Sequence, residues 1–201
     1  RNDLTLITLA EGSAVAGEPP FELARLGMSR TFQNLQVCMN MTAIENVMVG
    51  AHLRLAQGLL ASLLHLPGLR REDRACRDEA AGLMGFVGVG KYRAAHASQM
   101  PYGALKRLEI ARALAARPKM ILLDEPAAGL NDTETHEIEA LIRKIADSGV
   151  TVVLVEHDMK LVMNLSDHIL VLDYGKKLAE GTAAEVRANP DVIAAYLGAS
   201  A

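Results

Sequence analysis

The chain lacks tryptophan, contains only three phenylalanines and four tyrosines, and has two cysteines in 201 residues. Because Cys38 and Cys76 are isolated, a disulfide framework and a cysteine-rich metal site are excluded. No apolar stretch reaches the roughly 18 residues of a membrane-spanning helix, since His65 and Pro67 interrupt the stretch 59–69. A net charge of -3 gives no general attraction to nucleic acid or anionic lipid. We therefore expect a soluble or peripheral protein with no nucleic-acid partner.

An initiating methionine is also absent, and we expect that the chain begins inside a longer protein. The apolar stretch 4–10 loosely imitates an export signal, but it is short and Asp3 and Glu11 flank it. Half of the residues are hydrophobic, which suffices for one substantial core with a smaller lobe. The low aromatic content favours an aliphatic sheet covered by helices rich in alanine and leucine.

The most informative segment is a short apolar run that ends in two acids. Residues 120–123 are apolar and lie between Pro118 and Pro126, a pattern that indicates a buried parallel strand. Asp124 and Glu125 then stand at its carboxyl end, where open α/β sheets bind ligands. Neighbouring side chains on a strand point in different directions, so one acid can face a metal-bound water and the other an attacking water. The alternative is that the acids only cap the following helix.

Strands and helices alternate from residue 105 onward. The pattern predicts a parallel sheet with helical cover, in which 169–172 is the third strand. The predicted elements are a helix over 105–114, a helix capped by Asn131 or Asp132 that ends near 148–149, a buried strand at 150–155, a helix over 159–165, a strand at 169–172 followed by a turn at 174–175, a helix capped by Thr182 with Glu185, and a last helix from Asn189 through 197. Between 35 and 97 the spacing is mostly helical, and the eight charges at 70–79 indicate a solvated helix face.

A nucleotide triphosphatase with such a strand should also carry a glycine-rich phosphate loop. Residues 85–92 match its glycine and lysine spacing, but Tyr92 stands where a small hydroxyl should bind magnesium. The segment also follows a helical pattern and not a buried strand, which favours a helix end followed by a turn. We therefore expect that this chain carries no phosphate loop and that, alone, it hydrolyses ATP poorly or not at all.

Five segments in the same order resemble the motifs of the ATP-binding cassette (ABC) family of transporter ATPases. They are 30–33, which is similar to the glutamine loop; 100–104 with the helix after it, similar to the signature motif; 124–126, similar to the magnesium and water strand; 128–131, similar to the loop at the dimer seam; and His157, similar to the switch histidine. Five motifs in the correct order make coincidence very unlikely. The resemblance implies an α/β core of the P-loop NTPase type, truncated at its N-terminus, with an inserted helical subdomain.

The resemblance is closer to the ATP-binding subunits of branched-chain amino-acid importers. It rests on 31–34, 41–47, 127–131, 156–163 and 192–198, and it covers the chain from about residue 21 to its end. Pro101, Tyr102 and Ala104 stand where the wider family has Ser, Gly and Gln, and Asn131 replaces a usual Asp. Ala104 is the most consequential departure, because it removes a polar side chain beside the partner's nucleotide.

The resemblance implies ATP and Mg²⁺ as cofactors and assigns roles to individual residues. Glu125 would be the general base or the carboxylate that orients water, and Asp124 would hold magnesium through its water shell. Gln33 would complete the magnesium shell with its carbonyl oxygen and sense the nucleotide. His157 would contact the terminal phosphate.

The signature motif serves the ATP of a second subunit. Gly103 would let the backbone approach a phosphate at the positive end of the helix that follows. Tyr102, Ala104 and Asn131 would lie beside nucleotide at the same seam, with Tyr102 either stacking or simply packing. Two cassettes facing head to tail would therefore depend on each other.

The implied organisation is a partial core over 1–33 ending in the glutamine loop, a helical subdomain over 34–99, and the signature helix with the remaining core over 100–201. The implied partners are a second cassette subunit, membrane-embedded permease subunits and, indirectly, an extracytoplasmic amino-acid-binding protein. The implied location is the cytoplasmic face of a bacterial inner membrane. The alternatives are a cassette ATPase for another cargo, such as urea or an exported lipid, and a non-catalytic cassette that lends its signature helix to a partner.

Overall fold

The computed structural model describes residues 17–52, 54 and 67–197 of the chain. Two compact units are present: one is Gly17–Val155, and the other contains the described residues from Glu156 onward. The export-like stretch 4–10, and the part of 59–69 that precedes residue 67, lie outside the described residues. Among the helices of the described ranges, none is long and apolar enough to cross a membrane.

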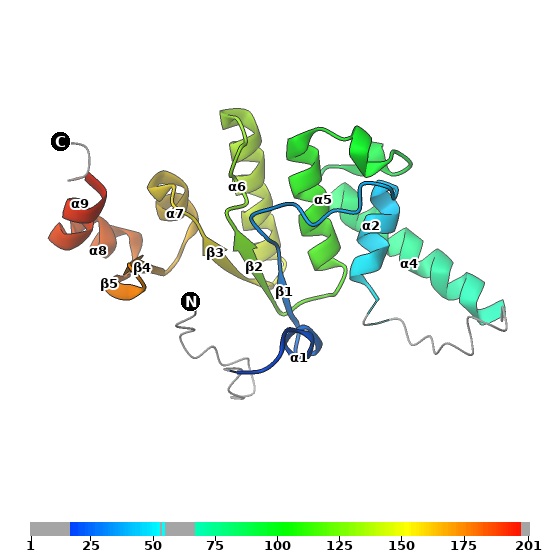
Figure 1. Ribbon diagram of the computed structural model, residues 1–201, viewed down its shortest axis with the longest axis horizontal. Helices are drawn as coiled ribbons and strands as arrows, with labels where there is room; N and C mark the ends of the chain where they lie inside the picture. Colours follow the sequence, from blue (N-terminus) through cyan, green and yellow to red (C-terminus); the bar gives the residue numbers. More distant parts are fainter. Residues whose placement is uncertain (1–16, 53, 55–66, 198–201) are drawn as a thin grey trace. The chain divides into compact units, whose positions relative to one another are not determined.

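A three-stranded parallel sheet lies in the first unit, in the order β1, β2, β3 (Figure 1). The strands are β1 (Met28–Arg30), β2 (Met120–Asp124) and β3 (Thr151–Val155). Met120 of β2 pairs with Met28 on one side and with Thr151 on the other. Ile121 and Leu123 of the central strand are fully buried. The parallel pairing and the position of β2 confirm the α/β prediction made from the apolar run before Asp124.

β3 is less buried than the sequence predicts. Thr151 and Val155 are exposed and the three residues between them are only partly buried. In the described part of the chain β3 pairs with β2 alone, so one of its edges carries no neighbouring strand. The strand lies where it was expected, but the prediction that 150–155 is buried is wrong for this reason.

In the first unit, a helix packs against each outer strand of the sheet. α1 (Pro20–Arg25) packs against β1, and α6 (Asp132–Asp147) packs against β3. Asn131 caps α6 by accepting a hydrogen bond from the Glu134 amide, and the Glu134 side chain accepts one from the Asn131 amide. This capping box confirms the predicted start of the helix, and its end at residue 147 confirms the predicted stop.

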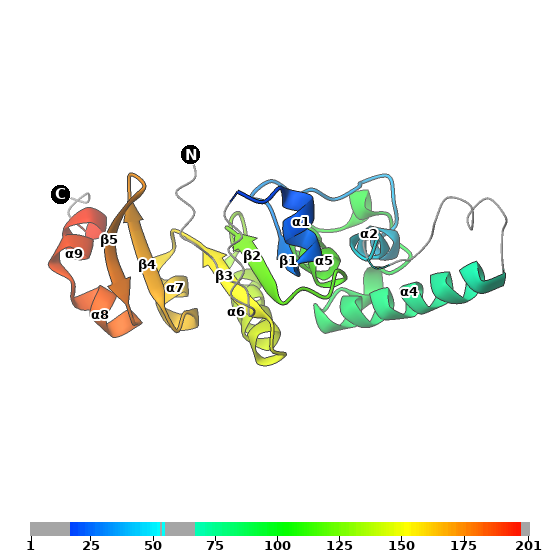
Figure 2. The ribbon, with the colours of Figure 1, turned by 90° about the horizontal axis from the view of Figure 1, so that it is seen from below.

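Three helices pack against one another beside the sheet (Figure 2). They are α2 (Ala43–Gly50), α4 (Pro67–Phe86) and α5 (Tyr102–Leu114), with the short 3₁₀ turns η1 (Gly90–Tyr92) and η2 (Ala97–Gln99) between α4 and α5. α5 buries Leu105, Leu108, Ala111 and Leu114, as the helical spacing predicts. Between residues 72 and 79, α4 exposes most of its charged residues, which confirms the predicted solvated face.

The near match to a phosphate loop at 85–92 is a helix end. α4 stops at Phe86, and Gly88 follows with a φ of 78°. The amide of Val89 donates to the carbonyl of Met84 at 2.8 Å, and the Gly88 amide donates to Gly85 at 3.2 Å. This is the left-handed helix termination that glycine favours. The expected helix end followed by a turn is confirmed.

The second unit contains a hairpin that the sequence did not predict. β4 (Ile169–Asp173) pairs antiparallel with β5 (Lys176–Gly181) and is not part of the parallel sheet. Tyr174 and Gly175 have φ values of 46° and 78°, the conformation of a two-residue hairpin turn. The prediction of a third parallel strand at 169–172 is therefore wrong. β5 was missed because its sequence is mostly polar, with only Leu178 and Ala179 apolar in its middle.

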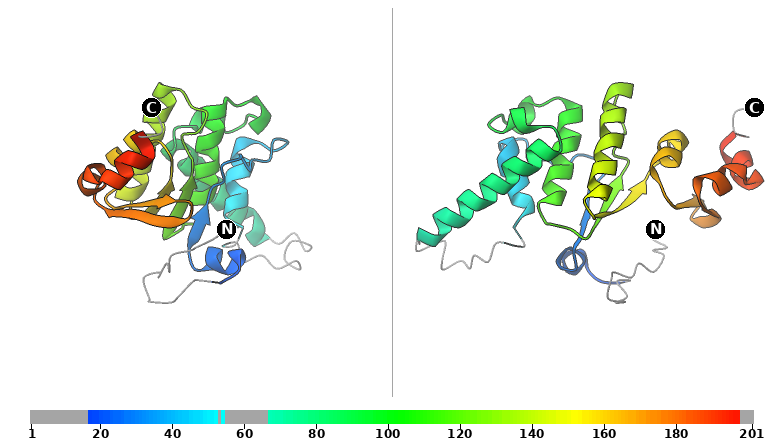
Figure 3. Two further views of the ribbon diagram at one scale, coloured as in Figure 1. Left: turned by 60° about the vertical axis from the view of Figure 1, so that its left-hand side comes forward. Right: turned by 180° about the vertical axis from the view of Figure 1, so that it is seen from behind.

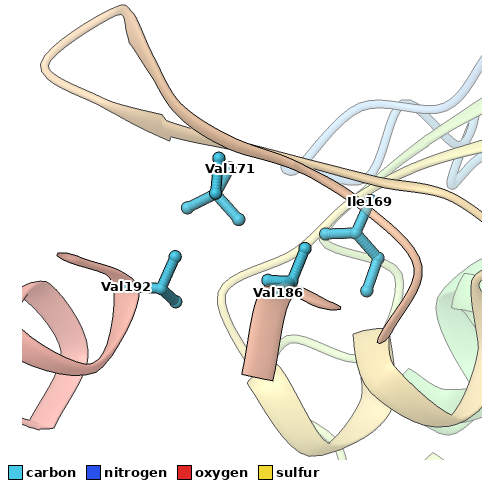
Figure 4. Close-up of a cluster of buried hydrophobic side chains, with 5 residues drawn as sticks. Ile169, Val171, Val186 and Val192 are labelled. Carbon is cyan, nitrogen blue, oxygen red and sulfur yellow. The ribbon is translucent and has the colours of Figure 1, made fainter. Parts of the chain in front are cut away.

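Short helices cover one face of this hairpin (Figure 3). They are α7 (Met159–Leu165), α8 (Ala183–Ala188) and α9 (Pro190–Leu197), all at the positions that the sequence predicts. Ile169 and Val171 of β4 form a small core with Val186 of α8 and Val192 of α9 (Figure 4). Ala179 of β5 completes this core. The capping box of Thr182 with Glu185 begins α8, as expected.

The close crossing of α2 and α5 generates a stability prediction. A Cβ at Gly50 would overlap the carbonyl oxygen of Arg112, which belongs to the backbone of α5 and cannot turn away. We expect Gly50→Ala to lower the free energy of unfolding by about 2 to 3 kcal/mol, because overpacking at a backbone atom forces the helices apart. Chemical denaturation followed by circular dichroism measures this change.

Gly82→Ala is the matched control. Gly82 lies inside α4, and an added Cβ would meet nothing within 4 Å. The same substitution there should raise the free energy of unfolding by roughly 0.5 to 1 kcal/mol, because alanine loses less backbone entropy in a helix. Equal effects at the two positions would contradict the proposed crowding between α2 and α5.

Candidate functional site

The carboxyl end of β2 turns sharply at Glu125. Asp124 is the last residue of the strand, and Glu125 has a φ of 45°, in the left-handed region. This conformation costs a residue with a side chain about 1 to 2 kcal/mol. It is held by the Glu125 amide, which donates to the carbonyl of Val155 at 2.9 Å. Glu125 therefore lies outside the extended geometry that Asp124 keeps at the end of β2.

Gln33 meets Glu125 directly. Its Nε2 donates to Oε2 of Glu125 at 2.8 Å, although the two residues are 92 positions apart in the sequence. Gln33 lies three residues after the end of β1, the strand that pairs with β2. The structure therefore brings together two of the residues that the sequence analysis assigned to one site, and it does so through a side-chain hydrogen bond.

Asp124 has a partner that sequence reasoning missed. Nη2 of Arg30 lies 2.9 Å from Oδ2 of Asp124, and the Arg30 guanidinium also lies 5.2 Å from the ring of Phe32. The Asp124 amide donates to the Thr31 hydroxyl at 3.4 Å. The only signal in the sequence was the place of Arg30, at the carboxyl end of β1 and directly before the glutamine loop.

Lys106 is a second residue that sequence reasoning missed. Its Nζ donates to the backbone carbonyl of Gln33 at 3.1 Å and to that of Glu125 at 3.4 Å. The residue is only 3% exposed, which is rare for lysine. The signal in the sequence was the position of this lysine, among the apolar residues that α5 buries on the turns before and after it.

The signature segment, residues 100–104, leads into α5 with Pro101 at the N-cap. A Cβ on Gly103 would lie 2.8 Å from Cδ of Glu134, so glycine lets the start of α5 lie close to that side chain. Tyr102 is 45% exposed, and its ring approaches Gly129, where an added Cβ would lie 3.2 Å from Cε1. Ala104 is buried inside this unit. The segment is therefore packed against the loop before α6.

The structure gives Asn131 one defined task, which is to cap α6 with Glu134. Its predicted position beside the nucleotide of a second subunit stays a prediction, as do those of Tyr102, Gly103 and Ala104. The segments that contain these four residues nevertheless lie side by side, because the approach of Tyr102 to Gly129 and that of Gly103 to Glu134 join the start of α5 to the start of α6.

His157 follows β3 by two residues and belongs to the second unit. Its side chain is 73% exposed, and its amide donates to Oε2 of Glu156 at 3.3 Å. Asp158 then caps α7 by accepting hydrogen bonds from the amides of Lys160 and Leu161. Gln33, Asp124 and Glu125 belong to the first unit, so the proposed contact of His157 with a terminal phosphate stays a prediction.

The donor atoms at the end of β2 suit magnesium. The carboxylate of Asp124 and the amide oxygen of Gln33 are hard oxygen ligands, which Mg²⁺ prefers. Within the described ranges no three His, Cys, Asp or Glu side chains form a metal cage. Magnesium in nucleotide sites does not need such a cage, because it is held by one or two protein oxygens together with phosphates and water. The residues present therefore fit this ion.

Glu109 is a fully buried carboxyl group beside this site. It lies on α5, is 2% exposed, and accepts a hydrogen bond from the Gln36 amide at 3.2 Å. Its nearest cation is Arg112, 3.9 Å away, and the charge of Lys106 also acts on it. Burial outweighs these favourable contacts and raises the pKa of Glu109 above its ordinary value of 4.5.

Family comparisons match this chain along most of its length. The family described as ABC transporter matches residues 7–128, and the family described as branched-chain amino acid ATP-binding cassette transporter matches 176–201. The high-affinity branched-chain amino acid transport ATP-binding protein BraF of Pseudomonas aeruginosa is 46% identical over 189 residues, which cover 94% of this chain and 74% of that protein. LivG of Escherichia coli, which has the same description, is 45% identical over 183 residues, covering 90% of this chain and 72% of that protein.

Solved structures give the same result for the fold. An ATP-binding cassette of an ABC transporter in its ADP conformation superposes with a TM-score of 0.76 at 30% identity, covering 94% of this chain and 75% of that one. A nucleotide-free cassette superposes with a TM-score of 0.75 at 29% identity, covering 92% of this chain and 74% of that one. These matches confirm the ABC-type α/β core that the motif order implied.

The buried carboxyl group gives a pH prediction. Because the folded-state pKa of Glu109 is raised, the folded chain binds more protons there than the unfolded chain at pH values just above 4.5. The contribution of this group to stability therefore falls as pH rises through its folded pKa. Glu109→Gln keeps an oxygen acceptor for the Gln36 amide. Because glutamine does not ionise, the variant lacks this decrease in stability with rising pH. We expect the melting temperature of the variant, relative to the parent, to increase between about pH 4.5 and pH 8.

Glu45→Gln is a control with the opposite sign. Hydrogen bonds from Thr42 lower the pKa of Glu45, so its contribution is complete above the unfolded value and is lost as pH falls. The melting temperature of this variant, relative to the parent, should decrease as pH rises toward about 4.5 and then stay nearly level up to pH 8. A melting temperature of Glu109→Gln that falls with rising pH, relative to the parent, would contradict the assigned cost of burial.

Proposed function

The chain belongs to the ABC transporter family, and we propose that it is the ATP-hydrolysing subunit of an importer for branched-chain amino acids. The relatives with 45 to 46% identity are described as high-affinity branched-chain amino acid transport ATP-binding proteins. The observation that carries the proposal is the 2.8 Å hydrogen bond between Gln33 and Glu125. It joins two motifs of a cassette ATPase at the end of β2, where a parallel sheet places its ligands.

In the proposed reaction, Glu125 orients the water that attacks the terminal phosphate of ATP and accepts its proton. The hydrogen bond from Gln33 fixes the direction of the Glu125 carboxylate. Asp124 and the amide oxygen of Gln33 would hold Mg²⁺, which supplies positive charge to the phosphate oxygens when it is bound. His157, two residues beyond β3, would contact the terminal phosphate. Catalysis of phosphoryl transfer comes mostly from positioning the reacting groups and from electrostatic stabilisation of the transition state. Each of these residues would contribute to one of these two effects.

The signature segment would serve the nucleotide of a second cassette. The first amides of α5 have no partner within the helix and lie at the positive end of its dipole. Gly103 would let this end approach a phosphate, with Tyr102, Ala104 and Asn131 beside it. Hydrolysis would then require two cassettes, because each active site takes its signature segment from the other subunit.

The remaining partners follow from the proposed transport role. The helical subdomain, 34–99, would receive membrane-embedded permease subunits at the cytoplasmic face of a bacterial inner membrane. An extracytoplasmic amino-acid-binding protein would deliver cargo to those permeases. The cassette itself contacts no cargo, so its selectivity resides in the other subunits.

The decisive variant for this proposal is Glu125→Gln in the assembled transporter. The amide cannot accept the proton of water, so we expect ATP hydrolysis to fall by at least about 100-fold while Mg²⁺-dependent ATP binding persists. Amino-acid uptake into vesicles should fall in parallel with phosphate release. Asp147→Asn is the control, since Asp147 lies at the exposed end of α6, and it should change neither rate.

Unchanged uptake with Glu125→Gln would refute the catalytic role and support a cassette that only lends its signature segment to a partner. A separate measurement addresses the cargo. Branched-chain amino acids, supplied with the cognate binding protein, should stimulate ATP hydrolysis by the intact complex. Stimulation by urea alone would contradict the proposed cargo and leave the ATPase proposal standing.

A further inference from the structure

Three charged side chains of α5 form hydrogen bonds with the backbone of one short segment. Lys106, Glu109 and Arg112 are spaced by three residues, so they lie along one side of the helix. All of them contact the backbone between residues 33 and 36, which follows β1 and contains Gln33. We call these three residues the α5 clamp.

Lys106, the first residue of the clamp, binds two separate segments of backbone. The Lys106 ammonium donates to the carbonyl of Gln33 and to the carbonyl of Glu125, at 3.1 Å and 3.4 Å. These are the backbones of the two residues whose side chains are hydrogen-bonded to each other. One buried cation thus fixes both ends of the contact between Gln33 and Glu125.

The other two members hold Gln36 by both of its backbone groups. Oε1 of Glu109 accepts from the Gln36 amide at 3.2 Å, and Nη1 of Arg112 donates to the Gln36 carbonyl. Arg112 also lies 3.9 Å from Glu109, which links the two clamp side chains. The segment from 33 to 36 contains no regular secondary structure, so α5 supplies hydrogen-bond partners that a sheet or helix would otherwise supply.

Stability alone does not explain the clamp. Burying a charge is costly unless it is paired, and apolar side chains on this part of α5 would avoid that cost. The two hydrogen-bond acceptors of Lys106 are neutral carbonyl oxygens, and burial raises the pKa of Glu109. Charge-assisted hydrogen bonds are, however, strong and directional, which suits them to fixing the position of a backbone.

We propose that the α5 clamp positions Gln33 against Glu125, so that the placement of the signature helix determines the geometry of the water-orienting pair. This inference rests on the proposed ATPase function and adds positioning residues to it. α5 begins at the signature segment and carries the clamp on its next turns. A shift of the helix therefore moves the backbones of residues 33 and 36 with it, and the contact between Gln33 and Glu125 changes as a consequence.

Lys106→Met and Lys106→Arg test the clamp in two ways. Methionine keeps the apolar stem and removes the cation, whereas arginine keeps a donor. Hydrogen exchange measured by mass spectrometry on the full chain should be about tenfold faster in the 31–36 segment of Lys106→Met, because a hydrogen bond to a charged donor is lost. Lys106→Arg should restore most of the protection.

Lys144→Met is the matched control. Lys144 of α6 also donates to a backbone carbonyl, that of Phe86 at 2.9 Å, but it lies on an exposed surface. It should leave exchange at 31–36 unchanged. Unchanged exchange at 31–36 in Lys106→Met would overturn the proposal. Faster exchange spread equally over α2 and α4 would also overturn it, because that result describes a general loss of stability.

The second readout is ATP hydrolysis by the assembled transporter. Lys106→Met should lower kcat about tenfold or more with little change in KM for ATP, because the clamp orients the groups that act on water and does not contact nucleotide. Lys106→Arg should recover most of kcat. A normal kcat in Lys106→Met would overturn the clamp while the ATPase function stands. If the parent complex hydrolyses no ATP, the proposed function fails, and the exchange measurement still decides whether the clamp orders the segment.

Discussion

The pairing of β1 with β2 is the constraint on which the candidate site depends. Arg30, the last residue of β1, pairs with Leu122, and the Thr31 amide donates to the Leu122 carbonyl at 2.9 Å. The chain leaves the sheet at that point, beside Asp124, and only one residue, Phe32, separates Thr31 from Gln33. An extended residue spans about 3.3 Å, so this short tether holds the Gln33 side chain within reach of Glu125. A slip of one residue would reverse the direction of each side chain on β1 and move Arg30 away from Asp124.

The sequence predicted the features whose causes are local. The predicted caps at Asn131 and Thr182 formed because a short polar side chain and a glutamate three residues later satisfy each other's amides. The resemblance to the cassette motifs, and not a local pattern, implied that residues 33 and 125 would share a site. β5 was missed because its mostly polar sequence gives a weak strand signal, and the exposure of β3 was missed because burial depends on neighbours outside the strand. Arg30 and Lys106 were missed because their partners lie about 94 and 73 positions away.

Arg30 and Lys106, two cations near the site, differ in their exposure to water. Arg30 is largely exposed and pairs with the Asp124 side chain, so water screens much of this interaction and it contributes about 1 kcal/mol or less to stability. Lys106 is buried and contacts backbone, where the same hydrogen bond acts in a medium of lower dielectric constant and is stronger. Because Arg30 is exposed, it can exchange Asp124 for another partner when the charge near Asp124 changes. The buried cation, Lys106, holds the backbone carbonyls of Gln33 and Glu125.

Tyr102, one of the departures in the signature segment, is compatible with the fold because it packs against a glycine. The Tyr102 ring lies so close to Gly129 that an added Cβ would be 3.2 Å from Cε1, and Gly129 also has a φ of 77°. A large residue at 102 therefore requires glycine at 129, which that loop conformation favours independently. Gly103 similarly allows the close approach of Glu134, whose carboxylate completes the cap of α6 with Asn131. The signature segment and the loop before α6 are thus one packed unit within this chain, and a change at Tyr102 or Gly103 must alter both motifs at once.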